Sequence, residues 1–151
     1  MQPTSGPLDI AHSIQLAIAP VFLLSGVGVT LTVLTNRLAR IIDRARVLEA
    51  ALPQATEAAS ATIQAELGTL SRRALLTYRA ITLSTACALL ICAVIMVLFA
   101  HVLITTTALY KLIVLLFVAA LGAFIGALVC FLQEIHIATA SLRFGPGAVE
   151  R

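Results

Sequence analysis

The sequence predicts an all-α membrane protein with three transmembrane helices and a cytoplasmic antiparallel helical hairpin between the first and second spans. The composition is 60% hydrophobic and only 11% charged, with a mean hydropathy of +1.05, whereas soluble proteins carry roughly 25% charged residues. Three apolar segments without acidic or basic residues each reach the roughly 20 residues that cross a hydrocarbon core. Most of the basic residues lie between the first two segments. The 151 residues are expected to form a single membrane domain, 1–151.

The predicted spans cover about residues 14–35, 81–100 and 112–132. Lys and Arg near the ends of a span favour the cytoplasmic side. Seven arginines lie between the first and second spans, only Lys111 lies between the second and third, and no basic residue precedes the first. We therefore expect the N-terminus outside and the C-terminus in the cytoplasm. Because a signal peptide needs a basic segment before its apolar core, the first span is expected to be retained.

The first span contains a proline, Pro20, which removes a backbone hydrogen bond and favours a kink. It also carries small and hydroxyl-bearing residues at mid-membrane depth: Ser25, Gly26, Gly28, Thr30 and Thr32. Such residues allow close helix packing and hydrogen bonds between helices. Pro20 with the two glycines is interpreted mainly as helix packing, with a hinge or a pore-lining break as the alternative.

The predicted hairpin covers about residues 37–80. Its first arm carries an apolar stripe at a spacing of three and four residues: Leu38, Ile41, Ala45, Leu48 and Leu52, with Ile42 beside it. A turn is expected at Leu52-Pro53-Gln54, because the residue before a proline disfavours helix. The second arm carries a matching stripe: Ile63, Leu67, Leu70, Ala74, Tyr78 and Ile81. Two such stripes joined by a short turn are typical of a helical hairpin.

The third span carries a small-xxx-small pair, Gly122 and Gly126, which is compatible with close helix contact. The cytoplasmic C-terminal tail, 133–151, is expected to begin as a continuation of this helix through Glu134 and to break at Gly145-Pro146-Gly147.

Three segments resemble a known family. They are A-P-V-F-L-L-S-G-V-G from Ala19, L-T-N-R-L-A-R-I-I-D-R-A-R-V-L-E from Leu34, and F-L-Q-E-I from Phe131. The chain is similar over most of its length to small bacterial inner-membrane proteins classed as domain of unknown function 2721. This resemblance implies a three-span protein of the bacterial inner membrane. It implies no activity and no catalytic residues.

The basic segment that follows the first span has three interpretations. The favoured one is that Arg37, Arg40, Arg44 and Arg46 set the topology and contact anionic lipid head groups. Nucleic acid is not expected as a partner, since the arginines lie so close to the membrane. The third interpretation is an ion-pair collar, in which Glu134 meets Arg37 and Arg40 at the cytoplasmic interface. Asp43 would then pair with Arg40 or Arg46 at a spacing of three residues.

Residues expected at the outer surface offer a weaker candidate site. Asp9 and His12 stand three residues apart, and His101 ends the second span. They are interpreted mainly as ordinary interface residues, because metal sites generally need three or four converging ligands; a proton- or metal-responsive site is the alternative. The three cysteines lie within spans and are expected to act as small hydrophobic residues, so neither a disulfide nor a metal site is predicted.

No nucleophile–base pair, phosphate-binding loop or cofactor motif is present in the sequence, so an enzyme is not expected and no cofactor is predicted. Two functions remain. The first is a homo-oligomeric structural or regulatory membrane protein that presents the hairpin to a cytoplasmic protein partner. The alternative is a small oligomeric ion or solute channel lined by Ser25, Thr30 and Thr32 of the first span.

Overall fold

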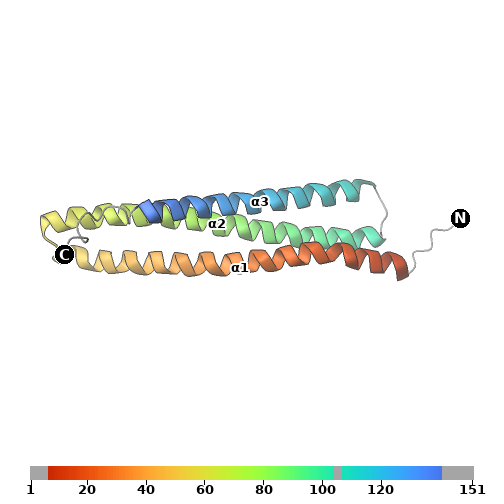
Figure 1. Cartoon of the computed structure of the whole chain (residues 1–151), viewed down its shortest axis with the longest axis horizontal. Coiled ribbons are helices and arrows are strands. Elements are labelled where there is room, and N and C mark those ends of the chain that lie inside the picture. The colour runs from red at the N-terminus through yellow and green to blue at the C-terminus, as the bar shows by residue number, and fades with distance from the viewer. Residues whose placement is uncertain (1–6, 104–106, 141–151) are drawn as a thin grey trace, which may run out of the picture. The chain divides into compact units, whose positions relative to one another are not determined.

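The part of the chain that the structure describes is almost entirely helical. The computed structural model describes the backbone of residues 7–103 and 107–140, and the side chains of residues 15, 18–100 and 109–139. It consists of α1 (Pro7–Ala51), the 3₁₀ turn η1 (Leu52–Gln54), α2 (Glu57–Leu103) and α3 (Thr107–Ala140) (Figure 1). These described ranges contain no strand. The all-α class predicted from the sequence is confirmed.

Each of the three helices is long and apolar enough to cross a membrane. The qualifying segments are Ile18–Gln54, Glu57–Ala100 and Leu109–Thr139, and the apolar 18-residue windows within them have mean hydropathies of 2.0, 2.7 and 2.9. The predicted spans 81–100 and 112–132 lie within the second and third segments, and most of 14–35 lies within the first. Three candidate spans suggest a multi-pass membrane protein.

The turn between α1 and α2 lies where the sequence predicts it. Pro53 falls in the first positions of the 3₁₀ turn, and Ala55 is extended, with φ −79° and ψ 143°. The Ala55 N–H donates to the Leu52 carbonyl at 3.3 Å. α2 then begins at Glu57, whose negative charge suits the positive end of the helix dipole.

Buried residues recur every seven positions along each helix. The fully or nearly buried residues are Pro20, Val27, Leu34, Ile41 and Leu48 on α1; Leu70, Thr77, Ser84 and Ile91, with Ala80, Cys87 and Val94, on α2; and Ala120, Ala127 and Glu134 on α3. A seven-residue interval corresponds to 3.5 residues per turn, the spacing at which helices crossing at a small angle keep one seam in contact. The stripes predicted from the sequence advance in steps of three and four residues and do not contain this longer interval.

The seven-residue interval corrects one of the predicted stripes. Tyr78 was expected on the inner face of the second arm, but it is 60% exposed, and the neighbouring Thr77 is buried at 1%. The predicted stripe advanced from Leu70 in steps of four residues, which overshoots a seam of 3.5 residues per turn. The buried face therefore passes from Leu70 to Thr77 and leaves Tyr78 outside.

The described helices contribute to two compact units. Unit 1 combines α1 up to Leu31 with Leu83–Ile125, and unit 2 combines Thr32–Thr82 with the part of α3 that begins at Gly126. In unit 1, the three helices meet at a core in which Val27, Cys87, Ile91 and Ala120 are all fully buried. Because Ala120 has a small side chain, α3 can approach this core closely.

The core of unit 2 is formed by α1 and α2 on either side of the turn. Ile41, Leu48 and Leu70 are buried together, and smaller or half-buried apolar residues pack against them: Ala45, Ile63, Leu67 and Ala74. These residues belong to the two stripes that the sequence predicts for the arms of the hairpin. α3 adds Glu134, a charged residue, to this unit.

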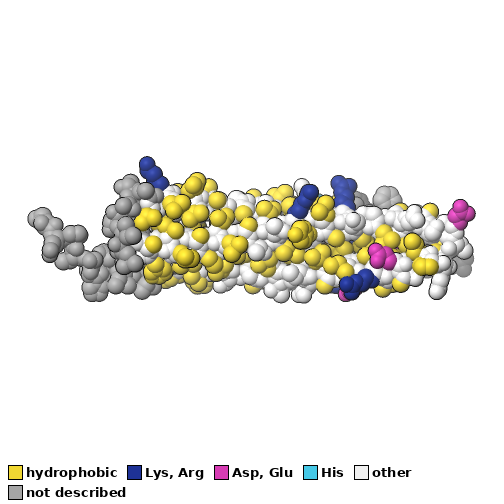
Figure 2. Space-filling view, turned by 180° about the vertical axis from the view of Figure 1, so that it is seen from behind, with side chains coloured by type: hydrophobic (Ala, Val, Ile, Leu, Met, Phe, Trp, Pro, Cys, Tyr) yellow, Lys and Arg dark blue, Asp and Glu magenta, His cyan; other side chains and the backbone are white. Residues whose placement is uncertain are grey.

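Large apolar side chains are exposed in unit 1. Phe22 is 74% exposed, Leu89 67% and Met96 73%. On the face drawn in Figure 2, hydrophobic side chains lie at the surface and charged ones are few. Since a soluble monomer rarely exposes large apolar patches, this surface suits contact with lipid chains.

Ile91→Ala should destabilise the protein because it opens a cavity in the core of unit 1, a change that typically costs about 2–5 kcal/mol. Leu89→Ala is the matched control on the same helix, since Leu89 is 67% exposed whereas Ile91 is fully buried. Thermal unfolding of the purified protein in detergent measures the difference. Equal losses of stability from the two substitutions would contradict the assignment of the core.

Candidate functional site

Glu134 occupies a position on α3 that the seven-residue interval assigns to the core. It follows Ala120 and Ala127 in that interval, and its side chain is fully buried. A carboxylate removed from water loses its hydration, and ion pairs and hydrogen bonds must replace it. The residues around Glu134 are therefore the centre of the candidate site.

Arg73 of α2 supplies hydrogen bonds to this carboxylate. Its Nε and Nη2 donate to Oε1 of Glu134 at 3.0 and 2.9 Å. Arg73 lies between the buried residues Leu70 and Thr77 on the inner face of its helix, and the Thr77 hydroxyl donates to the Arg73 carbonyl at 3.0 Å. The contact is a charge-assisted pair between α2 and α3, a stronger class than neutral hydrogen bonds.

Arg37 of α1 approaches the other carboxylate oxygen. Its Nη2 lies 2.7 Å from Oε2 of Glu134, but the N–H groups are not aligned on this oxygen, which accepts no hydrogen bond from the described residues. The contact is therefore an ion pair rather than a hydrogen bond. The Arg37 guanidinium carbon also lies 5.1 Å from the centre of the Phe131 ring, within the range of a cation–π interaction.

These three side chains form a charge cluster, Arg37–Glu134–Arg73, that joins the three helices within unit 2. The Arg37 and Arg73 side chains are 26% and 21% exposed, whereas the Glu134 side chain is fully buried. Two positive charges therefore surround one negative charge at the edge of solvent. Because the Glu134 carboxylate has no contact with water, the two arginines must stabilise its negative charge.

A second ion pair lies farther along α1 and is more exposed. Arg44 donates from Nε and Nη2 to Oε1 of Glu66 on α2 at 3.0 and 2.9 Å, and the side chains are 55% and 41% exposed. Exposed pairs of this kind contribute little to stability, typically about 0–1 kcal/mol. This ion pair therefore adds little to the stability of the contact between α1 and α2.

The local pairs expected for Asp43 differ from the structure. Among the described residues no ion pair joins Asp43 to Arg40 or Arg46, and all three side chains are exposed. A spacing of three residues permits a pair on one helix but does not compel it, since water competes for exposed charges.

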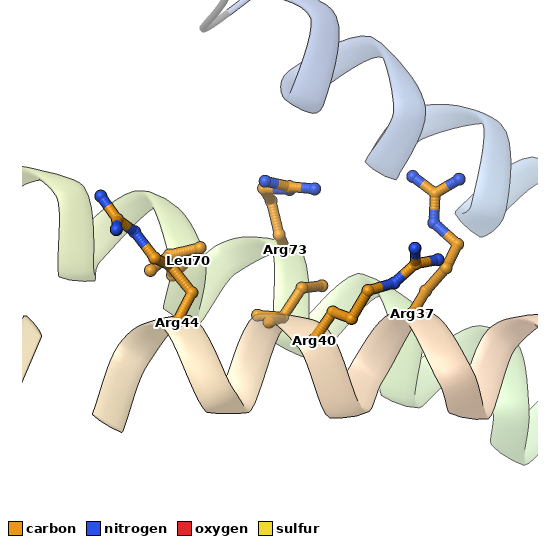
Figure 3. Close-up of a pocket in the computed structure, with 6 residues that line it drawn as sticks. Arg37, Arg40, Arg44, Leu70 and Arg73 are labelled. Carbon is orange, nitrogen blue, oxygen red and sulfur yellow. The ribbon is translucent and has the colours of Figure 1, made fainter. Parts of the chain in front are cut away.

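A pocket of about 400 Å³ opens beside the charge cluster in unit 2. Its lining consists of four arginines and two apolar residues: Arg37, Arg40, Arg44, Arg73, Ile41 and Leu70. Figure 3 shows Arg37, Arg40 and Arg44 leaving α1 and Arg73 leaving α2, with Arg37 extending toward α3. The pocket therefore combines an apolar floor with guanidinium groups, a lining that suits an anion.

The hydroxyl groups of the first span bond to their own helix. Ser25 Oγ donates to the Val21 carbonyl at 3.2 Å, and Thr30 Oγ1 donates to the Gly26 carbonyl at 3.0 Å. Ser25 and Thr32 are exposed, and Thr30 is half-buried. The Ser25 and Thr30 hydroxyl groups therefore donate hydrogen bonds to the preceding turn of α1.

Three of the glycines in the spans have open space around them. Nothing lies within 4 Å of a Cβ built at Gly26, Gly28 or Gly122, and Gly126 is half-buried. Pro20 is buried, and α1 continues through it as α-helix. Gly26, Gly28 and Gly122 therefore do not mediate close contact between helices of this chain.

The side chains of Asp9, His12 and His101 lie outside the described residues. Of the side chains that the structure does describe, no three from His, Cys, Asp and Glu gather as metal ligands would.

The sequence predicts Arg37 and Arg40 as partners of Glu134. The structure pairs Glu134 with Arg37 and Arg73, whereas Arg40 forms no ion pair with it. In the sequence, Arg73 is one of the seven arginines between the first two spans that predict the topology. The available signal was its register, because Arg73 stands three residues after Leu70 and four before Thr77 on the buried face. An arginine at the edge of a buried face is stabilised by an acidic partner, and Glu134 stands on the buried face of α3.

Glu134→Gln should lower the thermal stability of the purified protein in detergent, because it leaves two guanidinium groups without their counter-charge. Removing one partner of a buried pair typically costs about 3–5 kcal/mol. Glu66→Gln makes the same chemical change in the exposed pair with Arg44 and should cost about 0–1 kcal/mol. An unchanged melting profile for Glu134→Gln, or equal effects of the two variants, would count against the charge cluster.

Comparison with known proteins identifies a family. Residues 17–144 match the family model described as "Protein of unknown function (DUF2721)". No curated protein and no solved structure matches the chain. Because the match covers most of the sequence, it confirms the resemblance seen at Ala19–Gly28, Leu34–Glu49 and Phe131–Ile135. The chain belongs to the family of proteins of unknown function DUF2721.

Proposed function

We propose that this chain is a non-catalytic, homo-oligomeric protein of the bacterial inner membrane with a structural or regulatory role. In this proposal it presents a helical hairpin, about residues 37–80, to the cytoplasm. The charge cluster Arg37–Glu134–Arg73 stabilises the base of the hairpin, where α3 leaves the membrane.

The distribution of basic residues supports the orientation. Seven arginines lie between the first two spans and one lysine between the second and third, and basic residues next to spans favour the cytoplasm. The N-terminus would lie outside and the C-terminus inside. The arginines next to the first span would also contact anionic head groups at the cytoplasmic face.

The observation that carries the oligomeric part of the proposal is an uncovered face of α1. Ser25, Gly28 and Thr32 are exposed and follow one another at three and four residues, so they share a face of the helix. The space beside Gly28 is open. Since small residues in membrane helices allow close approach of another helix, this face fits a second copy of the chain.

Exposed apolar residues on the hairpin support a further contact. Val47 is 61% exposed, Leu75 49% and Tyr78 60%. In the proposed topology these side chains lie at or beyond the membrane surface. A second copy or a cytoplasmic protein partner would remove their apolar surface from water, which is favourable.

Gly28→Leu should weaken self-association, because a leucine would fill the space that a neighbouring helix needs while meeting nothing within its own protomer. Val29→Leu is the matched control at the next position, which is already 67% exposed and bulky. Native mass spectrometry of the full chain in mild detergent gives the stoichiometry. We expect an oligomer for the wild type and Val29→Leu, and mostly monomer for Gly28→Leu. A monomeric wild type would contradict the proposal.

The alternative function is a small oligomeric ion or solute channel lined by the first span. The exposure of Ser25 and Thr32 favours keeping this alternative, because hydroxyl groups on an uncovered face could line a central pore. It requires a ring of subunits in which this face of α1 points to the axis.

If the protein is a channel, the purified wild type should conduct ions in liposomes. Thr32→Val should reduce this flux, because the pore would lose hydroxyl groups. Val114→Leu on α3, where Val114 is 47% exposed, is the control and should leave the flux unchanged. Absence of flux from the wild-type protein, together with a dimeric or monomeric state, would exclude the channel.

A further inference from the structure

We propose that the arginine pocket of unit 2 is a binding site for a phosphate group. The pocket is the space of about 400 Å³ that Arg37, Arg40, Arg44 and Arg73 line together with Ile41 and Leu70 (Figure 3). This proposal makes the head-group contact of the arginines specific by assigning a site and a ligand group. Its choice of lipid as the source rests on the proposed membrane placement, and it does not depend on the oligomeric state.

The charges around the pocket do not balance. Arg37 and Arg73 share the single carboxylate of Glu134, and Arg44 pairs with Glu66. Four guanidinium groups therefore face two carboxylates, which leaves two uncompensated positive charges. A phosphate dianion, or two singly charged phosphodiesters, would supply the missing negative charge.

Arg40 is the residue best placed to bind the ligand. Its side chain is exposed and lines the pocket, and it forms no ion pair within the described part of the chain. Its guanidinium donors are therefore available, whereas those of Arg44 and Arg73 are directed at carboxylates. The planar fork of an arginine matches two oxygens of a phosphate group.

The lining of the pocket favours a phosphate ester over a bare ion. Ile41 and Leu70 are only 5% and 6% exposed and form an apolar floor beneath the arginines. A phosphate group fills a small part of about 400 Å³, so the apolar part of an ester has room beside it.

The proposed membrane placement favours the head group of an anionic phospholipid as the source of the phosphate. Arg40 stands five residues beyond the end of the predicted first span at residue 35, or about 7 Å farther along a helix. Head groups occupy roughly the outer 5–8 Å of each leaflet. A soluble phosphate from the cytoplasm carries the same chemistry and is the other source.

The test uses the full chain in a phosphate-free maltoside detergent at constant ionic strength. One arm adds phosphatidylglycerol or cardiolipin, and the other adds inorganic phosphate or pyrophosphate. Binding is measured as a shift in melting temperature and as an apparent dissociation constant. The variants are Arg40→Gln and, as the matched control, Arg72→Gln. The control removes one exposed positive charge from the same unit but does not line the pocket.

We expect the wild type to bind at least one of these probes. Arg40→Gln should weaken binding about tenfold, because one charge-assisted contact is lost, and Arg72→Gln should bind as the wild type does. Binding of lipid alone would identify the head group as the source, and binding of phosphate or pyrophosphate alone would identify a soluble ligand. Equal binding by the two variants, or no binding of any probe by the wild type, would overturn the proposal.

Discussion

In unit 2 the carboxylate of Glu134 lies out of contact with solvent, and Arg73 of α2 and Arg37 of α1 hold it from two sides. Apolar contacts alone specify helix rotation weakly in a membrane, because lipid chains are as apolar as the side chains they would replace. A buried ion pair is directional, and breaking it leaves an uncompensated charge. The rotation and register of the three helices in this unit therefore depend on the charge cluster.

Each unit has buried residues at intervals of seven, but the two units are closed by different interactions. Unit 1 is closed by small and apolar residues such as Val27, Ile91 and Ala120, which suits helices surrounded by lipid. Unit 2 combines an apolar core with an arginine-rich pocket, which suits helices that leave the membrane at a layer of phosphate groups. Arg37, Arg40, Arg44 and Arg73 outnumber their acidic partners, and among these four Arg40 is the one without an ion pair in the described structure; the proposed phosphate site rests on this excess of positive charge.

Much of the fold follows from local sequence signals. Composition and segment length predict three apolar helices, and Pro53 predicts the turn. The pairing across helices was harder to predict. Arg73 and Glu134 are 61 residues apart, and Arg44 and Glu66 are 22 apart, so each pair depends on the register of two helices. A stripe counted in steps of four also drifts from a seam of 3.5 residues per turn, which is why Tyr78 was assigned to the wrong face.

The central claim is that Glu134 and the arginines stabilise the protein as one coupled cluster. A double-mutant cycle with Arg73→Gln, Glu134→Gln and the double variant tests it most directly, with the free energy of unfolding measured in mild detergent. The account predicts strong coupling of about 1 kcal/mol or more, because removing the second partner no longer leaves the first charge uncompensated. Losses of stability that simply add in the double variant would contradict it.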